Sequence, residues 1–188
     1  MGDFGNLNEL ENACLTCTKC ELHQTRTNIV FGVGSSKPKV LFIGEGPGEK
    51  EDQRGEPFVG RSGELLDEML KTIGLSRKEN IYIANIVKCR PPGNRDPHRA
   101  EREACIGWLR AQIKLLHPKI VVCLGRIAAC EIIDSNLKIT LDHGKWYEVD
   151  SIKYMALFHP AALLRDPSKK PDTFADLKEL EKMIKQIG

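Results

Sequence analysis

The sequence has no apolar run approaching the roughly 20 residues that cross a bilayer, so no membrane partner is expected. Its N-terminus has neither a basic start nor an apolar stretch, which argues against a secretory signal and predicts a cytoplasmic protein. An excess of one charge is also lacking, because 28 Lys and Arg face 26 Asp and Glu. The net charge of +2 neither demands nor excludes a polyanionic partner. With 188 residues, 41% of them hydrophobic, the chain suffices for one domain with a buried core.

Apolar runs of two kinds alternate along the chain. Short continuous runs predict four buried strands, at residues 39–43, 80–87, 119–124 and 153–158. Apolar residues at helical spacing predict helices at 62–73, 98–116, 127–133 and 172–187. This alternation predicts an α/β fold, a three-layer sandwich with a central, mostly parallel four-stranded sheet flanked by helices. Since no linker interrupts the pattern, we expect a single domain over residues 1–188.

The remaining segments indicate where a site would lie. A short helix broken by cysteines is expected over 7–22, a long Gly- and Pro-rich loop over 44–60, and an irregular or hairpin segment over 138–149. Polar residues directly follow three of the predicted strands, at 44–52, 85–90 and 159–165. Ligands bind beyond the carboxyl ends of strands in open parallel sheets, so these three segments are expected to form one site.

Seven cysteines are many for a chain without a secretory signal, and their odd number argues against a complete set of disulfides. Five of them form an N-terminal CxxCxxC group and a downstream pair: Cys14, Cys17, Cys20, Cys89 and Cys105. Four thiolates can hold a zinc ion or an iron–sulfur cluster, and this spacing distinguishes neither from the other nor from free thiols. Cys123 and Cys130 lie in a predicted strand and helix and are expected to be buried.

The loop after the first predicted strand reads GEGPGEKED over residues 44–52. A Gly-rich loop in this position can cradle a phosphate with its backbone N–H groups, or it can be a long turn. It lacks the Lys-Ser/Thr pair of a P-loop and the helix entry of a dinucleotide site. The loop alone therefore identifies no ligand.

Five segments are specific when taken together: CTKCELHQTRTNIVFG (17–32), GEGPGEKED (44–52), EPFVGRSG (56–63), NIVKCRPPGNRDP (85–97) and HPAALLR (159–165). In order and spacing they resemble the family 4 uracil-DNA glycosylases, the iron–sulfur enzymes of the uracil-DNA glycosylase superfamily. The resemblance implies a base-excision-repair enzyme that flips uracil from DNA, hydrolyses the N-glycosidic bond and leaves an abasic site. A non-enzymatic nucleic-acid-binding module and a glycosylase for another base are the alternatives.

The resemblance also implies a cofactor. In the family a CxxC precedes an Arg-Thr and a Phe-Gly, and this chain has the same register. The implied ligands of a 4Fe–4S cluster are therefore Cys17, Cys20, Cys89 and Cys105, with Cys14 left over. The cluster would be structural and would pack the segment 10–32 on the core.

Three side chains are implied to contact the base. His159 is the candidate donor to uracil O2, where negative charge develops, and a neutral imidazole suffices. Asn85 offers a donor and an acceptor that match the O4 and N3 edge of uracil and mismatch cytosine. Without the resemblance, His159 could equally be a histidine that caps a helix, and Asn85 could equally be a turn residue at the end of a strand. Phe58 is implied to stack on the flipped base, although its apolar neighbours also allow a core role.

The loop over 44–52 supplies the remaining pocket residues. Glu45 is the candidate group to activate water, because the better-known branch of the superfamily has an aspartate where this chain has Gly46. Gly46 is implied to line the pocket floor. Glu51 resembles the residue that crowds out the 5-methyl group of thymine, although a solvated acid would read the same way.

The segment after His159 is implied to contact DNA. Leu163 resembles the wedge pushed into the space that uracil vacates, unless it packs in the core, and Arg165 is a candidate phosphate contact. Further basic residues could bind phosphates: Lys88, Arg90, Arg95, Arg99, Lys169 and Lys170. The implied partner is uracil-containing DNA, either double- or single-stranded. The protein is expected to act as a monomer and to lie in a prokaryotic cytosol or nucleoid. A sliding clamp is a possible further partner, but no segment of the sequence indicates one.

Overall fold

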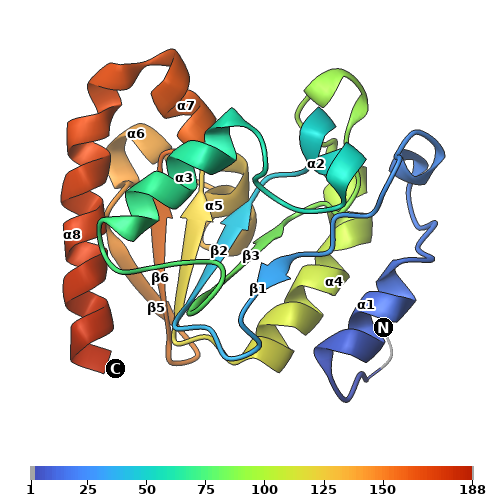
Figure 1. The fold of residues 1–188 in the computed structure, drawn as a ribbon, viewed down its shortest axis with the longest axis horizontal. Helices are drawn as coiled ribbons and strands as arrows, with labels where there is room; N and C mark the ends of the chain where they lie inside the picture. Colours follow the sequence, from blue (N-terminus) through green and yellow to red (C-terminus); the bar gives the residue numbers. More distant parts are fainter. Residues whose placement is uncertain (1–2, 188) are drawn as a thin grey trace.

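A six-stranded sheet forms the middle of the molecule (Figure 1). The computed structural model describes residues 3–187. The strands lie in the order β1 (Val33–Gly34), β3 (Ile81–Asn85), β2 (Val40–Gly44), β4 (Ile120–Leu124), β6 (Ile152–Leu157) and β5 (Trp146–Val149). The four central strands are parallel, whereas β1 and β5 pair antiparallel at the two edges.

The predicted α/β sandwich is confirmed, but the predicted number of four strands is wrong. The four predicted strands form the parallel centre of the sheet, and two short edge strands were missed. β1 has two residues, too few to show a period. β5 lies in the segment predicted as irregular or hairpin, and it is half-buried at Trp146 and exposed at Val149. An edge strand with little burial has no apolar run by which a sequence can reveal it.

Four helices lie where the apolar spacing predicts them: α3 (Arg61–Lys71), α4 (Arg99–Leu116), α5 (Arg126–Ile132) and α8 (Lys170–Ile187). The N-terminal helix α1 (Leu7–Cys14) ends before the cysteine-rich turn, which is followed by the 3-10 turn η1 (Glu21–Gln24). Other short elements fall in segments without a clear period: α2 (Glu49–Arg54), η2 (Pro92–Asn94), α6 (Ile139–Asp142), α7 (Pro160–Arg165) and η3 (Pro167–Lys169). α2 has the sequence EKEDQR, so it contains no apolar residue from which to infer a helix.

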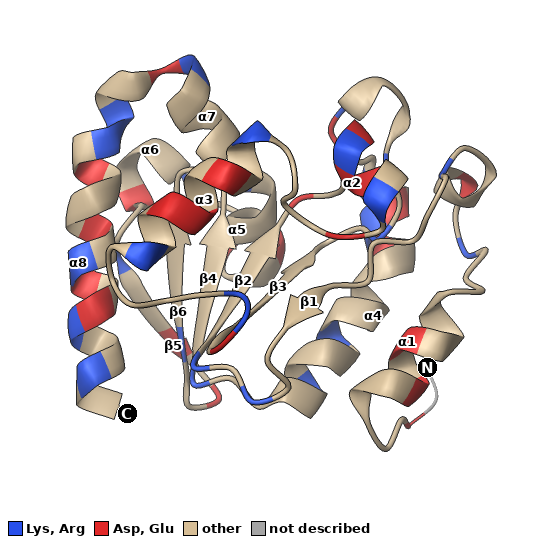
Figure 2. Ribbon diagram, viewed as in Figure 1, with Lys and Arg blue, Asp and Glu red and all other residues tan. Residues whose placement is uncertain are grey.

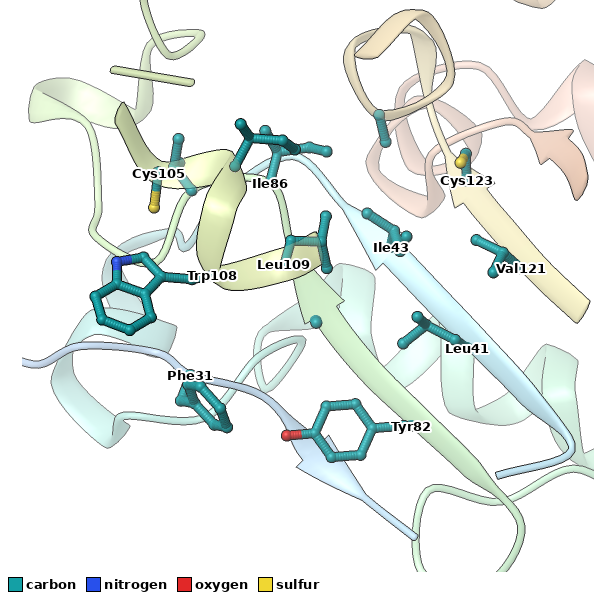
Figure 3. Close-up of a cluster of buried hydrophobic side chains, with 14 of the residues drawn as sticks. Phe31, Leu41, Ile43, Tyr82, Ile86, Cys105, Trp108, Leu109, Val121 and Cys123 are labelled. Atoms are coloured by element: carbon teal, nitrogen blue, oxygen red, sulfur yellow. The ribbon is translucent and has the colours of Figure 1, made fainter. Parts of the chain in front are cut away.

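Different helices cover the two faces of the sheet. On one face, Leu41 and Val121 pack in a cluster with Trp108 and Leu109 of α4 (Figure 3). On the other face, alternate strand residues such as Phe42 pack with apolar side chains of α3, α7 and α8. Successive strand residues point to opposite faces, so strands covered on both sides become continuous apolar runs.

Charged residues lie on the helices, loops and other strands rather than on β2, β3 and β4 (Figure 2). β2, β3 and β4 contain no Lys, Arg, Asp or Glu. Asn85, at the last position of β3, places a polar amide at the end of these otherwise uncharged strands. Within residues 3–187, no helix combines the length and the apolar character needed to span a membrane.

Candidate active site and cysteine chamber

A cavity of about 640 Å³ lies at the carboxyl ends of β2, β3 and β6. All the residues predicted to act on the base line it: Glu45, Gly46, Glu51, Phe58, Asn85 and His159. β2 and β3 are parallel neighbours with Gly44 opposite Asn85, so the segments that follow them leave the sheet together. The expected meeting of the three polar segments at one edge of the sheet is confirmed, while the role of each residue stays a prediction.

Asn85 is buried at the end of β3, with 2% of its surface exposed. Its Oδ1 atom has no hydrogen-bond partner and is the only such buried side-chain atom within residues 3–187. A side chain at Gly44 would collide with this oxygen and with the ring of Phe58, so glycine leaves room for both. Because a buried acceptor without a donor costs free energy, a ligand that brings an N–H group would gain by binding here.

Lys88 is buried and cannot contact a phosphate as the sequence suggested. Its Nζ donates to the backbone carbonyl of Asn85 at 3.0 Å and to Oε1 of Gln112 at 2.6 Å. Burial lowers the pKa of Lys88 to about 8. The lysine therefore fixes the backbone of Asn85 from inside the molecule.

His159 lines the cavity and caps the N-terminus of α7. Its Nδ1 accepts a hydrogen bond from the backbone N–H of Ala161 at 3.1 Å. A neutral imidazole that accepts at Nδ1 carries its proton on Nε2, which is left as a donor. Burial lowers the pKa of His159 to about 4, with a further lowering from Arg165 and an opposing effect of Glu51. At neutral pH the ring is therefore an uncharged donor.

Phe58 stacks on His159, with ring centroids 5.5 Å apart and ring planes inclined by 28°. Its backbone has φ of +53°, a left-handed conformation that a bulky residue rarely adopts. Gly63 in α3 permits this conformation, since any side chain there would collide with the Phe58 carbonyl. The ring both packs in a core cluster and lines the cavity, so it meets the requirements of both roles considered for it.

Two charged side chains hold the turn that carries Phe58. Arg77 donates from Nη1 to the carbonyl of Pro57 at 2.7 Å and from Nη2 to the carbonyl of Phe58 at 2.8 Å. Glu51 accepts from the backbone N–H groups of residues 59–60, both at 2.9 Å. Arg77 was not among the predicted site residues, because its segment SRKEN has the composition of a solvated turn.

Glu45 directly follows β2 and is half-buried in the cavity wall. Burial, and then the nearby Asp96, raises the pKa of Glu45 to about 7, although Arg126 and Arg102 act in the opposite direction. Asp96 and Arg126 form an ion pair at 3.3 Å on the rim of the same cavity. A carboxyl group with a pKa near neutrality is suited to take a proton from water.

The leucine expected to enter DNA is turned inward. Leu163 is 0% exposed and packs among apolar side chains beside α3 and α8. Leu164, the next residue of α7, is 37% exposed. Consecutive helical residues point in directions about 100° apart, so the helix buries one leucine and exposes the other. This burial argues against the wedge role predicted for Leu163, whereas Arg165 is exposed at the cavity.

The four cysteines predicted to hold a cluster line one chamber: Cys17, Cys20, Cys89 and Cys105. Cys14 lines the same chamber and is buried. N–H donors lie 3.3 Å from three of the sulfurs: Trp108 Nε1 from Cys17, Arg26 Nη1 from Cys89, and the backbone N of Lys88 from Cys105. Donors of this kind stabilise negatively charged sulfur.

Comparison with known proteins identifies the class. The model of the uracil DNA glycosylase superfamily matches residues 31–184, so the chain belongs to that superfamily. A type-4 uracil-DNA glycosylase of Archaeoglobus fulgidus is 44% identical over 183 residues, which cover 93% of this chain and 92% of that protein. Another type-4 uracil-DNA glycosylase, of Thermotoga maritima, is 41% identical over 177 residues, covering 92% and 91%. Within the superfamily, the chain belongs to the type-4 family.

Proposed function

We propose that the chain is a monofunctional uracil-DNA glycosylase that flips uracil from DNA, hydrolyses its N-glycosidic bond and leaves an abasic site for base-excision repair. One observation carries the proposal: within residues 3–187, a buried amide oxygen without a donor and an imidazole whose Nε2 has no acceptor line the same cavity. The two type-4 relatives support it, because they carry this activity in their names. A base inside a duplex cannot reach such a cavity, so it must be flipped or taken from single strands.

The proposed chemistry places one polar atom of the protein at each polar group of uracil. Asn85 accepts from N3–H and donates to O4, while His159 Nε2 donates to O2. As the bond to deoxyribose breaks, negative charge gathers on O2, so the bond from His159 strengthens in the transition state. Phe58 stacks on the base and Gly46 lines the floor beside Glu45.

Two carboxylates would complete the site. Glu45 takes a proton from the water that attacks the sugar, a task for which its raised pKa is suited. Glu51 is held by two backbone N–H groups and lies against Gly48, which has no side chain to displace it. We infer that a carboxylate fixed in this way crowds out the 5-methyl group of thymine.

We infer that a 4Fe–4S cluster is held by Cys17, Cys20, Cys89 and Cys105. The donor set fits, because four thiols line one chamber and N–H groups face three of them. When bound, the cluster would cross-link the segment 10–32 to the core.

The proposed substrate is uracil in double- or single-stranded DNA, with Arg165 at a phosphate. We infer that the chain acts as a monomer and as one domain over residues 1–188. We place it in the prokaryotic cytosol or nucleoid, because the DNA that it repairs lies there. No segment is assigned to a sliding clamp.

An oligonucleotide assay beside an iron measurement tests the proposal. We expect purified protein to convert a uracil-containing oligonucleotide to an alkali-labile abasic site and to release free uracil. Oligonucleotides with thymine, cytosine or hypoxanthine at the same position are the controls. Binding without release of uracil would instead favour a non-enzymatic DNA-binding module.

The raised pKa of Glu45 predicts a pH profile. A general base must be deprotonated, so kcat/KM should fall as the pH drops below about 7. Since the pKa of His159 is lowered to about 4, His159 contributes no second fall near neutrality. A Glu45→Gln variant should lose the pH-dependent fall together with most of its rate.

Asp96 and Arg126, which form an ion pair on the rim of the cavity, provide matched controls for the assignment of Glu45 as the general base. Asp96 raises the pKa of Glu45 and Arg126 lowers it. Asp96→Asn should therefore move the acidic limb to lower pH, and Arg126→Gln should move it to higher pH. Shifts in the same direction, or no shift in either variant, would show that another group sets the limb.

The two leucines of α7 should respond differently to truncation. Leu163→Ala should destabilise the protein by about 2–5 kcal/mol, because it opens a cavity in the core. We propose that the exposed Leu164 takes the wedge role in place of Leu163. Leu164→Ala should then leave the melting temperature nearly unchanged and lower activity on duplex DNA more than on single strands, since a wedge helps only when a base must leave a stack. Equal losses on both substrates would remove Leu164 as a wedge.

Single cysteine variants separate cluster ligands from other buried thiols. Cys89→Ser should lose the brown colour and bound iron, and the protein should melt at a lower temperature. Cys123→Ser is the matched control, because Cys123 is buried in β4 and does not line the chamber. Stoichiometric zinc in colourless wild-type protein would contradict the cluster assignment.

A further inference from the structure

We propose that Arg77 is a positioning residue of this glycosylase, which holds Phe58 in the left-handed conformation that presents its ring to the flipped base. The inference rests on the proposed function, because it assigns a task within the same site. Arg77 does not itself line the cavity. It acts through the backbone of the turn that carries Phe58, from which it is 19 residues distant in the sequence.

The guanidinium of Arg77 fits this turn by shape as well as by charge. Its side chain is 11% exposed, and its two terminal nitrogens bond separately to the carbonyls of Pro57 and Phe58. Nε bonds to Asp67 at 3.0 Å, and Glu56 lies 3.5 Å from Nη1. A planar fork with five donors can make all these contacts at once, whereas a lysine ammonium cannot.

The turn needs such a restraint because Phe58 is strained. A residue other than glycine keeps a φ of +53° only where surrounding contacts hold it there. Arg77 binds the carbonyls on one side of the turn, and Glu51 binds the N–H groups of residues 59–60 on the other. Without Arg77, the backbone of Phe58 can relax to negative φ and turn the ring away from His159.

The contacts of Arg77 differ in what they can do for the site. Asp67 and Glu56 have side chains that are 37% and 45% exposed, so water can replace them as partners of the guanidinium. The two carbonyls belong to the turn itself, and the bond to Phe58 fixes the residue whose ring stacks on His159. Positioning of the ring therefore depends on the carbonyl bonds and not on the surface ion pairs.

Arg77→Ala tests the proposal through binding of the base. We expect the KM for uracil-containing DNA and the inhibition constant Ki of free uracil to rise by about tenfold or more, the loss expected when a base loses its stacking partner. Millimolar guanidinium should restore part of the lost affinity, because it can refill the vacated site. Asp67→Asn keeps both carbonyl bonds and should leave Ki within about twofold of the wild type.

Two further variants keep the test decisive if Arg77→Ala fails to fold. Arg77→Lys keeps the charge but not both carbonyl bonds, and Gly63→Ala disturbs the Phe58 carbonyl with Arg77 intact; both should raise Ki. Leu180→Ala, a core truncation in α8, should lower the melting temperature without changing Ki. A wild-type Ki in folded Arg77 variants, or an equal rise in Leu180→Ala, would overturn the proposal. Wild-type protein that releases no uracil would instead overturn the proposed function.

Discussion

We expect a His159→Ala variant to release uracil from DNA about 10²- to 10³-fold more slowly than the wild-type protein, the usual loss when one donor to a developing oxyanion is removed. The bond from Ala161 N–H to Nδ1 fixes the proton of the neutral ring on Nε2, and alanine removes that donor. Because the bond strengthens only as charge develops on O2, the loss should appear in kcat and leave KM nearly unchanged. Single-turnover rates at saturating protein measure this directly.

A second His159 variant separates catalysis from helix capping. His159→Asn keeps a side-chain oxygen that can cap the Ala161 N–H, so its melting temperature should stay near that of the wild type. Its rate should still be low, because the shorter amide does not reach the base. The loss should also be the same from about pH 6 to about pH 9, since the wild-type ring is neutral throughout that range. A loss confined to the acidic end would mean that the imidazolium is the donor.

The parts of this molecule that could be predicted from the sequence are those buried on both sides. Apart from Asn85 at the end of β3, the strands β2, β3 and β4 are apolar runs because helices cover both faces of the sheet. Parallel strands place the residues that follow them at a common edge, which brought Glu45, Asn85 and His159 to one cavity. The parallel centre of the sheet and the position of the site could therefore be predicted without knowledge of any contact.

The parts that could not be predicted depend on short elements and on contacts between distant segments. The rotation of α7 decides that Leu163 is buried and Leu164 exposed, and six residues show too little periodicity to reveal it. Phe58 has a positive φ, which cannot be predicted from a phenylalanine in the sequence. Arg77 contacts its carbonyl from a polar turn 19 residues away. The raised pKa of Glu45 likewise depends on burial and on residues of two other segments.

Asn85→Ala should lower kcat/KM for uracil-containing DNA by about 10²- to 10⁴-fold, because two hydrogen bonds to the edge of the base are lost in a buried site. Asn94→Ala is the matched control: Asn94 lines the same cavity but is exposed on its rim, so its loss should change kcat/KM by no more than about threefold. Similar losses in the two variants would show that Asn85 has no special part in reading the base.

The melting temperatures of Asn85 variants distinguish a role of Asn85 in recognising the base from a role in supporting the fold. The Oδ1 atom of Asn85 makes no hydrogen bond within residues 3–187, so alanine removes an unsatisfied buried acceptor and the melting temperature should not fall. Asn85→Asp should weaken the preference for uracil over cytosine, because a protonated carboxyl group can donate to N3 of cytosine and accept from its amino group. A variant that unfolds, or an aspartate variant that still rejects cytosine as fully as the wild type does, would mean that this amide supports the sheet and that another group recognises the base.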